Sequence, residues 1–478
     1  RGRRIHSYKI NLMRRLLYIL LIFAVTAQTC AALEIVCSPG SIASLLEGKE
    51  VDALTISGSI DASDIFYIAD NHPQLKTIDL SRCAITAYNG MPLKGRSQYP
   101  ADAIPPAAFA GTAIETIIFP AIPALAIGEG AFAGSGLKRL ELPSGKAEIA
   151  DGAFAACLSL GEVDIHTPAT VGRYAFRGCT SLRRADLSGV TTLGDKAFAS
   201  CHALTAVVFG PALAVIGSSA FESCALTAAD LATTRVTTLG DRAFADNSCL
   251  ESITLPQGLK DLGKGTFFDC TALGDITIPD GCTTLPDYAL KDSGLRDITM
   301  TNVSHIGAYS LKGASAMLHL ALPPTLTSIG DNAMEGMTTL ESINGSGLTT
   351  VPTLGNDVWD GVDQGKVYLI VKGSRVADFA DTPQWKEFKI IDSESSGIAE
   401  NQIADGLRGI ITDSILHIES QGADMTMVEV YDPAGQLVAT ARPMARTCAI
   451  DITNHTSQIF IVRTTLADST VASLKLAR

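Results

Sequence analysis

The chain has 478 residues, of which 46% are hydrophobic and 18% are charged, and its formal net charge is −13. A chain longer than roughly 300 residues exceeds what one hydrophobic core organises, which excludes a single compact globule and predicts several domains or a repeat array. The hydrophobic share excludes wholesale disorder. All charged residues before Leu33 are basic, so the remainder is more acidic than the total. That acidity argues against nucleic acid and anionic lipid as partners.

The first 32 residues have the layout of a secretory signal peptide. Two basic residues, Arg14 and Arg15, precede an apolar run over residues 16–25, and small or polar residues then lead to Ala32. The apolar run is shorter than the ~20 residues that a membrane-spanning helix needs. We therefore predict cleavage near Ala32, no transmembrane segment in the mature chain, and a secreted or bacterial outer-membrane surface location. Lipid modification at Cys30 is the alternative.

A repeat of 22 or 23 residues is the strongest pattern in the sequence. An apolar residue, in most repeats a Phe preceded by Ala, recurs along the middle of the chain. Its positions are Phe109, Phe132, Phe154, Phe176, Phe198, Phe221, Phe244, Phe267, Leu290, Leu311 and Met334. Such a period is typical of a solenoid, whose stacked coils shield one another's apolar faces. We therefore predict one continuous column of buried side chains at these positions.

Each repeat also predicts one bend and one short strand. An aliphatic-Gly pair such as Leu239-Gly240 lies four or five residues before the Phe, and Gly there allows a bend that no side chain obstructs. After the Phe come a leucine and two apolar residues one position apart, often followed by Pro, as in residues 250–256. This alternation indicates a strand with one buried face. The predicted fold is mainly β, a leucine-rich-repeat solenoid of about eleven coils of 22–23 residues with end caps.

The repeats resemble the BspA-like leucine-rich repeat family of bacterial surface proteins, from about Leu33 to Asp392. Residues 54–64 and 75–81 resemble that family's N-terminal cap and first coil. Residues 367–374, followed by residues 385–388, resemble its closing cap. Caps are needed because terminal coils would otherwise expose apolar faces and unpaired strand edges.

The resemblance implies a domain division and a kind of function. Residues 33–100 would form the N-terminal cap and first coil, and residues 101–392 the repeats with the closing cap. The family is associated with adhesion to host matrix proteins such as fibronectin and fibrinogen, so the resemblance implies a surface protein that binds macromolecules without catalysis.

Residues 393–478 predict a separate small β-sandwich. A polar joint over residues 392–397 precedes about six short alternating runs. Residues 428–438 and 459–463 resemble the C-terminal sorting domain of the type IX secretion system, which implies export across the outer membrane and attachment at the cell surface. This chain has Ser-Gln at residues 457–458, where the family usually has Gly before its last aromatic strand. An accessory domain without a sorting role is the alternative.

The cysteines and the missing catalytic motifs predict a protein without an active site. Five of the eleven cysteines lie three residues after a repeat Phe and are expected to fill an inward column as reduced, inert thiols. They are Cys157, Cys179, Cys201, Cys224 and Cys270. Paired Cys-x-x-Cys zinc ligands, the serine elbow, and the Walker and dinucleotide fingerprints do not occur in the sequence. We predict no enzymatic activity, no metal and no cofactor.

One column of strand positions is the candidate binding strip. It is the residue between the two buried residues of each strand, which strands in register would expose as a ladder. Its members are Glu141, Asp164, Asp186, Asp230, Thr254, Thr277 and Thr299. Like charges on neighbouring strands repel, so the ladder suits either a basic or polar partner segment, or a solvated face that Arg139 and Arg184 neutralise.

Three functions fit the sequence. The first is a secreted, surface-attached protein that binds host matrix or other proteins through many weak contacts along the solenoid. The second is a glycan-binding protein of a bacterial envelope, which the low aromatic content of 6% disfavours. The third is a passive surface spacer.

Overall fold

The structure is a computed structural model that describes residues 32–393 and 407–477, apart from seven positions in the second range: 413, 421, 422, 434, 456, 458 and 469. The predicted signal peptide up to Ala31, with Cys30, and most of the polar joint therefore lie outside the described residues. The chain divides into two units, one ending at Leu182 and the other beginning at Arg183. The three domain boundaries inferred from the sequence stay predictions.

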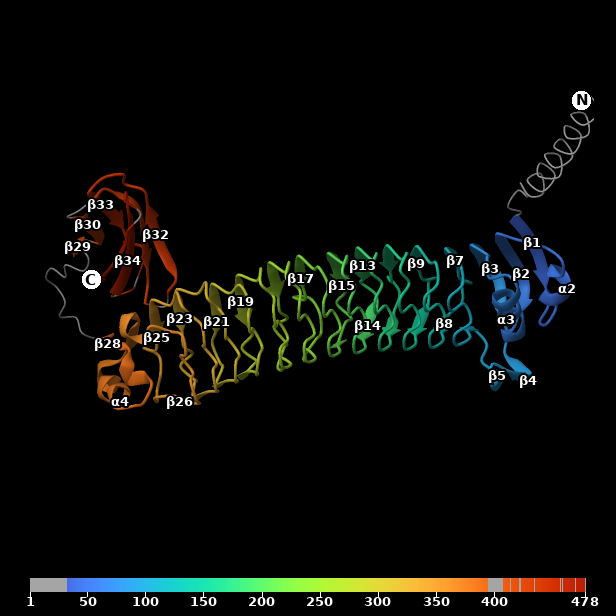
Figure 1. The fold of residues 1–478 in the computed structure, drawn as a ribbon, viewed down its shortest axis with the longest axis horizontal. Coiled ribbons are helices and arrows are strands. Elements are labelled where there is room, and N and C mark those ends of the chain that lie inside the picture. Colours follow the sequence, from blue (N-terminus) through green and yellow to red (C-terminus); the bar gives the residue numbers. More distant parts are fainter. Residues whose placement is uncertain are drawn as a thin grey trace, which may run out of the picture. The chain divides into compact units, whose positions relative to one another are not determined.

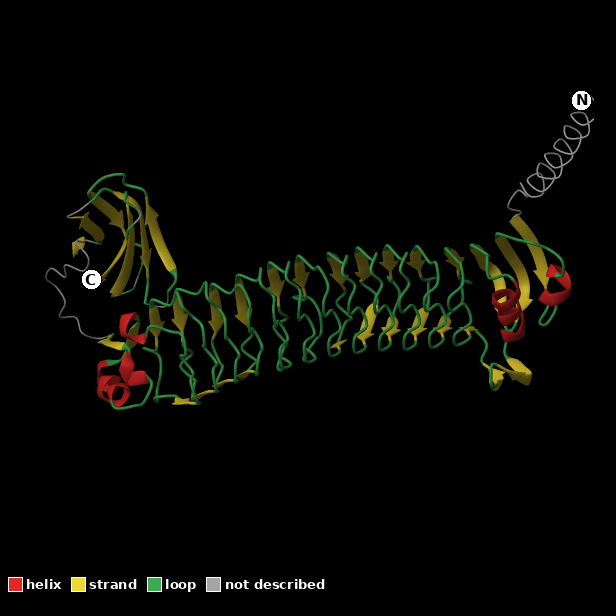
Figure 2. Cartoon of the chain, in the orientation of Figure 1, coloured by secondary structure: helices red, strands yellow, loops and turns green. Residues whose placement is uncertain are grey.

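The first unit begins with a parallel sheet and two helices beside it (Figure 2). The sheet pairs β1 (Ala32–Cys37), β2 (Ala53–Ile60), β3 (Thr77–Ile85) and β7 (Thr116–Ile118) in that order. The helices are α2 (Ile42–Leu46) and α3 (Ala62–Asn71), and β4 (Tyr88–Leu93) and β5 (Arg96–Tyr99) form a hairpin. Helix α3 begins with a capping box, in which Asp61 accepts from the Ser63 amide and Asp64 accepts from the Asp61 amide.

Within each unit the coils then stack as short parallel strands on two sides, which Figure 1 shows as successive rungs. In the first unit one side has β6 (Ala103–Ile104), β8 (Ala124–Ile127), β10 (Lys146–Ile149) and β12 (Ala169–Val171), and the other has β9 (Arg139–Glu141) and β11 (Glu162–Asp164). We call the outward side of β9, β11 and the strands equivalent to them in later coils the strand face.

The second unit continues the same arrangement. Its strand-face pairs are β13 (Arg184–Leu187) with β15 (Ala206–Phe209), β17 (Ala228–Asp230) with β18 (Ser252–Thr254), and β19 (Asp275–Ile278) with β21 (Asp297–Met300). They are followed by β23 (His319–Ala321), β25 (Ser342–Asn344), β27 (Tyr368–Val371) and β28 (Lys389–Asp392). The other side has β14 (Val190–Leu193), β16 (Val215–Ile216), β20 (Thr284–Leu285), β22 (His305–Ile306), β24 (Ser328–Ile329) and β26 (Thr353–Leu354).

The Phe column predicted from the period is present in both units. In the first unit the rings from Phe109 to Phe176 stack with centroids 5.2–5.3 Å apart. In the second unit the rings from Phe198 to Phe267 stack 5.4–6.0 Å apart. All these rings are fully buried, as are Leu290, Leu311 and Met334 at the same position of later coils. The predicted solenoid fold is confirmed.

The glycine of the aliphatic-Gly pair has a different role from the predicted bend. Neither Gly240 nor Gly263 has a φ in the left-handed region. A Cβ on Gly240 would lie 2.4 Å from the Ser218 amide nitrogen, and one on Gly263 would lie 2.4 Å from the Asp241 nitrogen. The glycine is therefore required because successive backbones approach too closely to admit a side chain.

The turn around each repeat Phe uses two left-handed residues, which the sequence pattern did not predict. Around Phe244 these are Arg242, with φ of 55°, and Asp246, with φ of 58°. Their amides donate to the carbonyls of Lys264 and Phe268 in the next coil, each at 2.8 Å. We call this side of the coil, from two residues before to two residues after the repeat Phe, the turn ridge. Along the turn ridge, backbone hydrogen bonds join neighbouring coils although the residues there do not form regular strands.

The inward cysteine column is present as free, buried thiols. Four of these thiols donate to the carbonyl of the repeat Phe one coil earlier: Cys157 to Phe132 at 3.1 Å, Cys179 to Phe154 at 3.2 Å, and Cys224 to Phe198 and Cys270 to Phe244, each at 3.3 Å. Burial raises the pKa of the Cys224 and Cys270 thiols to about 12. A thiolate is the reactive form of cysteine, so these side chains are inert at neutral pH.

Asn247 stands at the cysteine position of its coil and makes more hydrogen bonds there. Its Nδ2 donates to the Phe221 and Phe244 carbonyls, each at 2.8 Å, and its Oδ1 accepts from the Leu226 amide at 3.2 Å. The side chain is fully buried. We expect Asn247→Ala to lower the free energy of unfolding by about 2–3 kcal/mol, because it leaves buried backbone groups unpaired. Urea denaturation measures the loss.

Asn247→Cys is the matched control, since Cys270 makes the equivalent contact to Phe244 one coil later. We expect it to cost less than half as much as Asn247→Ala. Equal losses from both substitutions would contradict the hydrogen-bonding role of Asn247.

Aromatic side chains close the repeat array at its C-terminal end. Helix α4 (Val376–Ala380) follows β27, and the Phe379 ring meets the Trp385 ring edge-on at a centroid distance of 5.3 Å. Trp359 contacts the Phe388 ring at 5.0 Å, and Trp385 Nε1 donates to the Pro352 carbonyl at 3.0 Å. This cluster shields the last coil as a cap must.

Residues from Leu407 onward form two small antiparallel sheets with one shared apolar core. The first sheet pairs β29 (Leu407–Thr412), β30 (Ile415–Ser420) and β33 (Thr447–Asp451), and the second has β32 (Leu437–Ala441), β31 (Met425–Tyr431), β34 (Ile459–Leu466) and β35 (Val471–Ala477). The predicted alternating runs match β30 to β35. The prediction missed β29, which contains Gly409, a residue type that weakens a strand pattern.

Candidate binding surface on the strand face

In the first unit, the acidic members of the predicted strip are joined by an arginine. Glu141 of β9 lies opposite Asp164 of β11. Arg139 Nη2 contacts the Asp164 carboxylate at 2.7 Å and the Glu141 carboxylate at 4.0 Å, and Arg139 Nη1 lies 3.9 Å from Glu162. Glu141 is exposed, whereas Asp164 is only 5% exposed.

Asp186 in the second unit follows the same pattern. Its carboxylate contacts Arg184 Nη2 at 3.1 Å and accepts from the Ser188 amide at 3.1 Å, and it is 9% exposed. The expectation that every strip residue is exposed is therefore wrong for Asp164 and Asp186. Asp186 pairs with Arg184 of its own strand, and Asp164 pairs with Arg139 of the neighbouring strand β9. Arginines of the strands themselves therefore pair with the two buried carboxylates of the strip.

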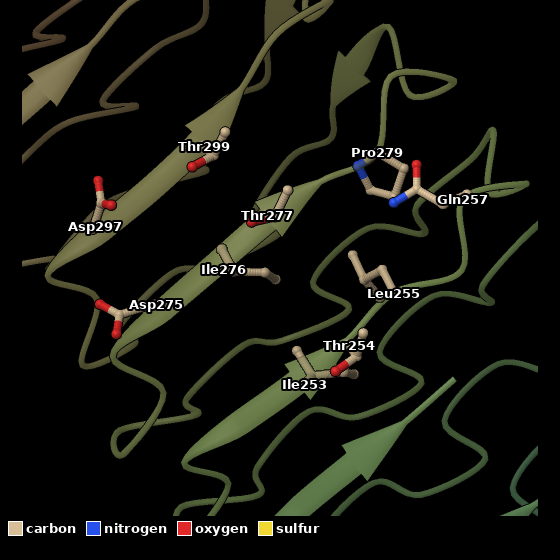
Figure 3. A pocket seen from close by; sticks show the side chains of 10 residues that line it. All are labelled: Ile253, Thr254, Leu255, Gln257, Asp275, Ile276, Thr277, Pro279, Asp297 and Thr299. Atoms are coloured by element: carbon tan, nitrogen blue, oxygen red, sulfur yellow. The ribbon is translucent and has the colours of Figure 1, made fainter. Parts of the chain in front are cut away.

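The three threonines of the strip are exposed and line a groove. Asp230 of β17 lies opposite Thr254 of β18, and Thr277 of β19 lies opposite Thr299 of β21. A half-open groove of about 400 Å³ includes all three threonines in its lining (Figure 3). The structure thus brings together the polar second half of the predicted strip in one concave site.

The groove lies where the sheet is interrupted. β18 pairs with β17 and β19 pairs with β21, but among the described residues no ladder joins β18 to β19. The groove is lined from both sides of this interruption. Ile253, Leu255, Ile276 and Pro279 supply its apolar lining. An apolar lining with a few convergent polar groups is the usual composition of a binding pocket.

Two carboxylates complete the groove, and the sequence analysis missed them. Asp275 and Asp297 lie opposite each other on β19 and β21. Shielding from water by neighbouring atoms, together with the Asp275 charge, raises the pKa of Asp297. Arg296 Nη2 lies 3.6 Å from the Asp275 carboxylate. A ligand that brings a cation or several hydroxyl donors relieves this like-charge pair.

A period-2 pattern was the signal that would have found these carboxylates. Asp275 and Asp297 stand two residues before Thr277 and Thr299, and alternate residues of a strand share one face. The predicted strip contains only the column of Thr277 and Thr299, whereas Asp275 and Asp297 belong to the neighbouring column of the same face.

The described part of the chain has neither a cluster of metal ligands nor a membrane-spanning helix. Residues 32–393 and 407–477 hold no group of three or more His, Cys, Asp or Glu side chains arranged to bind a metal ion. Within the same ranges, no helix is both long and apolar enough to span a bilayer.

Several solved bacterial proteins match parts of this chain. One from Bacteroides ovatus is 21% identical, covers 75% of this chain and 88% of its own, and gives a TM-score of 0.55. A leucine-rich cell surface protein from Faecalibacterium prausnitzii is 18% identical, and the match covers 57% of this chain and 86% of that protein, with a TM-score of 0.28. The pneumococcal vaccine antigen PcpA is 17% identical, and the match covers 76% of this chain and 84% of PcpA, with a TM-score of 0.32. At these identities only the fold of the first is informative.

No curated protein matches the chain. The BspA type leucine rich repeat region matches residues 102–227 and 237–361, more than half of the sequence. These residues hold the Phe column, the cysteine column and the turn ridge. The chain belongs to the family of proteins with BspA type leucine rich repeats.

Proposed function

We propose that this chain is a non-catalytic, secreted cell-surface protein that binds a macromolecule, a host matrix protein or another protein, through its strand face. The groove between β18 and β19 is the anchor of that contact. The observation that carries the proposal is that Thr254, Thr277 and Thr299, predicted as a ladder from the sequence, line a concave site together with Asp275 and Asp297.

The chemistry of the groove favours a protein segment with a basic side chain. The carboxylates of Asp275 and Asp297 provide charge-assisted acceptors, and the threonine hydroxyls accept or donate as the partner requires. The site stands on strands of a stacked repeat, so little conformational entropy is lost on binding. Additional weak contacts along the strand face would add affinity through multivalency.

The surface location rests on the two ends of the sequence. The signal-peptide layout supports export. The resemblance of residues 428–438 and 459–463 to the type IX sorting domain supports passage across the outer membrane and surface attachment. The two antiparallel sheets of this region are compatible with such a domain and equally with an accessory one.

The carboxylates provide the test of the groove. We expect the double substitution Asp275→Asn with Asp297→Asn to weaken binding to immobilised fibronectin or fibrinogen by about tenfold, the loss of roughly one charge-assisted hydrogen bond. Surface plasmon resonance with the full chain measures the change.

The matched control removes the same charge elsewhere. Asp261 and Asp381 are exposed and lie outside the groove, so Asp261→Asn with Asp381→Asn should leave binding unchanged. Equal weakening by both pairs of substitutions would show that binding depends on the net charge of the chain and not on the groove. Undiminished binding of the groove variant would refute the groove as the anchor.

A further inference from the structure

The two antiparallel sheets of residues 407–477, which we call the C-terminal sheets, contact the last coils within the second unit. The Tyr431 ring at the end of β31 lies 4.8 Å from the His319 ring of β23, centroid to centroid. Arg463 of β34 has its Nε 3.9 Å from the carboxylate of Glu341, the residue before β25. An aromatic contact and an ion pair therefore join the C-terminal sheets to the strand face.

A glycine allows the turn after β31 to lie against His319. Gly435 has φ of 78°, and its amide donates to the Asp432 carbonyl at 2.9 Å. A Cβ on Gly435 would lie 2.7 Å from the His319 Cβ. The backbone of this turn thus approaches the histidine too closely to admit a side chain.

His319 fits this contact as a neutral imidazole. Its Nδ1 lies 2.9 Å from Ser342 Oγ, and its Nε2 is buried with no hydrogen-bond partner among the described residues. Burial, followed by the Arg463 charge, lowers the pKa of His319 to about 4. A proton on this ring would add a buried positive charge near a guanidinium group.

Arg463 already has two carboxylate partners. Its Nε faces Glu341 of the solenoid, and its Nη1 lies 3.9 Å from Glu429 of the C-terminal sheets. The titratable and charged groups on the elements packed against His319 are Asp297 on β21, Glu341 before β25, Glu429 and Tyr431 on β31, Asp432 in the following turn and Arg463 on β34. The ion pairs satisfy one cation in this contact, and a second cation at His319 has no such arrangement.

We propose that the contact around His319 and Arg463 holds the C-terminal sheets on the strand face at neutral pH and releases them in acid. When the sheets are released, water surrounds His319 and its pKa returns towards the ordinary value of 6.5. Above that pH the ring is neutral in both states, and docking has its full strength. As the pH falls from 6.5 towards 4, the released state takes up a proton that the docked state does not. Docking weakens by up to about thirtyfold at pH 5.

Glu341 acts in the opposite direction. Burial raises its pKa, so the docked state takes up a proton at this carboxyl more readily than an exposed carboxyl does. The His319 effect begins near pH 6.5, above the ordinary range of a carboxyl, and it therefore dominates in mild acid. Replacing His319 by a neutral side chain separates the two contributions.

Single-molecule energy transfer on the full chain counts the docked and released molecules. One dye is attached to the exposed Cys249 and the other to a cysteine introduced by Thr440→Cys on β32, in a chain that also carries Cys448→Ser. His319→Gln keeps a neutral hydrogen-bonding side chain beside Ser342.

Two further variants complete the experiment. His305→Gln is the matched control, because His305 Nδ1 makes the same kind of contact, at 2.7 Å to Ser328 Oγ, on the other side of the coils. Gly435→Asn adds the Cβ that clashes with His319, and asparagine tolerates a left-handed φ. It therefore gives the signal of released sheets. Circular dichroism shows whether each variant is folded.

We expect the ratio of docked to released molecules to fall by roughly ten- to thirtyfold between pH 7.5 and pH 5. His319→Gln should remove this dependence and His305→Gln should retain it, while Gly435→Asn should be released at both pH values. A ratio that does not change with pH in the wild type would overturn the proposal. So would an unchanged pH dependence in folded His319→Gln, or docking by folded Gly435→Asn. No measurement here involves a partner or the groove, so failure leaves the proposed function standing.

Discussion

Phe221→Ala is expected to lower the free energy of unfolding by about 3–5 kcal/mol, the range for removing a fully buried Phe. Phe221 is fully buried and stacks on Phe198 and on Phe244, each at 5.4 Å. Phe209 meets the same ring edge-on at 5.6 Å. The backbones of neighbouring coils are joined by hydrogen bonds on both sides, so the cavity cannot collapse easily. Urea denaturation followed by circular dichroism measures the loss.

Two further substitutions separate packing from a general effect of mutation. Phe221→Leu should cost clearly less than Phe221→Ala, since Leu290 and Leu311 fill the same column position in later coils. Val208→Ala, at a strand-face residue that is 43% exposed, should change stability by less than about 0.5 kcal/mol. A Phe221→Ala midpoint equal to that of the wild type would show that the column does not hold the coils together.

The second large effect is expected from adding a single methyl group where two coils touch. Gly240→Ala places a Cβ 2.4 Å from the Ser218 nitrogen and 2.5 Å from the Gly217 carbonyl carbon. Both atoms belong to the backbone of the preceding coil, so neither can swing aside as a side-chain end would. We expect a loss of about 2–4 kcal/mol in the free energy of unfolding, at or above the upper end of overpacking effects.

Gly258→Ala is the matched control in the same part of the chain. Its Cβ would have no heavy atom within 4 Å, and its φ lies outside the left-handed region. We expect this variant to be neutral or slightly stabilised, because alanine restricts the unfolded chain more than glycine does. Similar losses from Gly240→Ala and Gly258→Ala would mean that the close approach of neighbouring coils does not explain why glycine recurs at this position of the repeats.

The solenoid was predictable because its signal is periodic. Phe154, Phe176 and the other repeat aromatics recur at a spacing that only stacked coils turn into a buried column. The cysteine column followed from the same period, since Cys224 and Cys270 hold one fixed place relative to the Phe. The repeat period was therefore sufficient to predict the solenoid and the residues that face its interior.

The turn ridge was not predictable because no residue type marks it. Its left-handed positions hold residues as different as Arg242, Gly265 and Tyr288. Contacts between coils impose that conformation, and a single repeat does not show them.

The burial and grouping of the site residues also depended on neighbours. Asp164 is buried because Arg139 lies beside it, a contact across 25 positions of the chain. Thr254 and Thr277 line one groove although no ladder joins β18 to β19, and the sequences of these strands do not differ in kind from those of paired strands. A sequence pattern places a residue on a face, whereas its exposure depends on the adjacent coil.

Site-specific photocrosslinking tests most directly whether partners bind at the strand face. A benzophenone amino acid is placed in the full chain at Thr277, in the groove, or at Asn332, on the turn ridge, and each protein is irradiated with fibronectin or fibrinogen. We predict a crosslinked complex from the Thr277 position and none above background from the Asn332 position. Crosslinking from Asn332 with none from Thr277 would contradict the account.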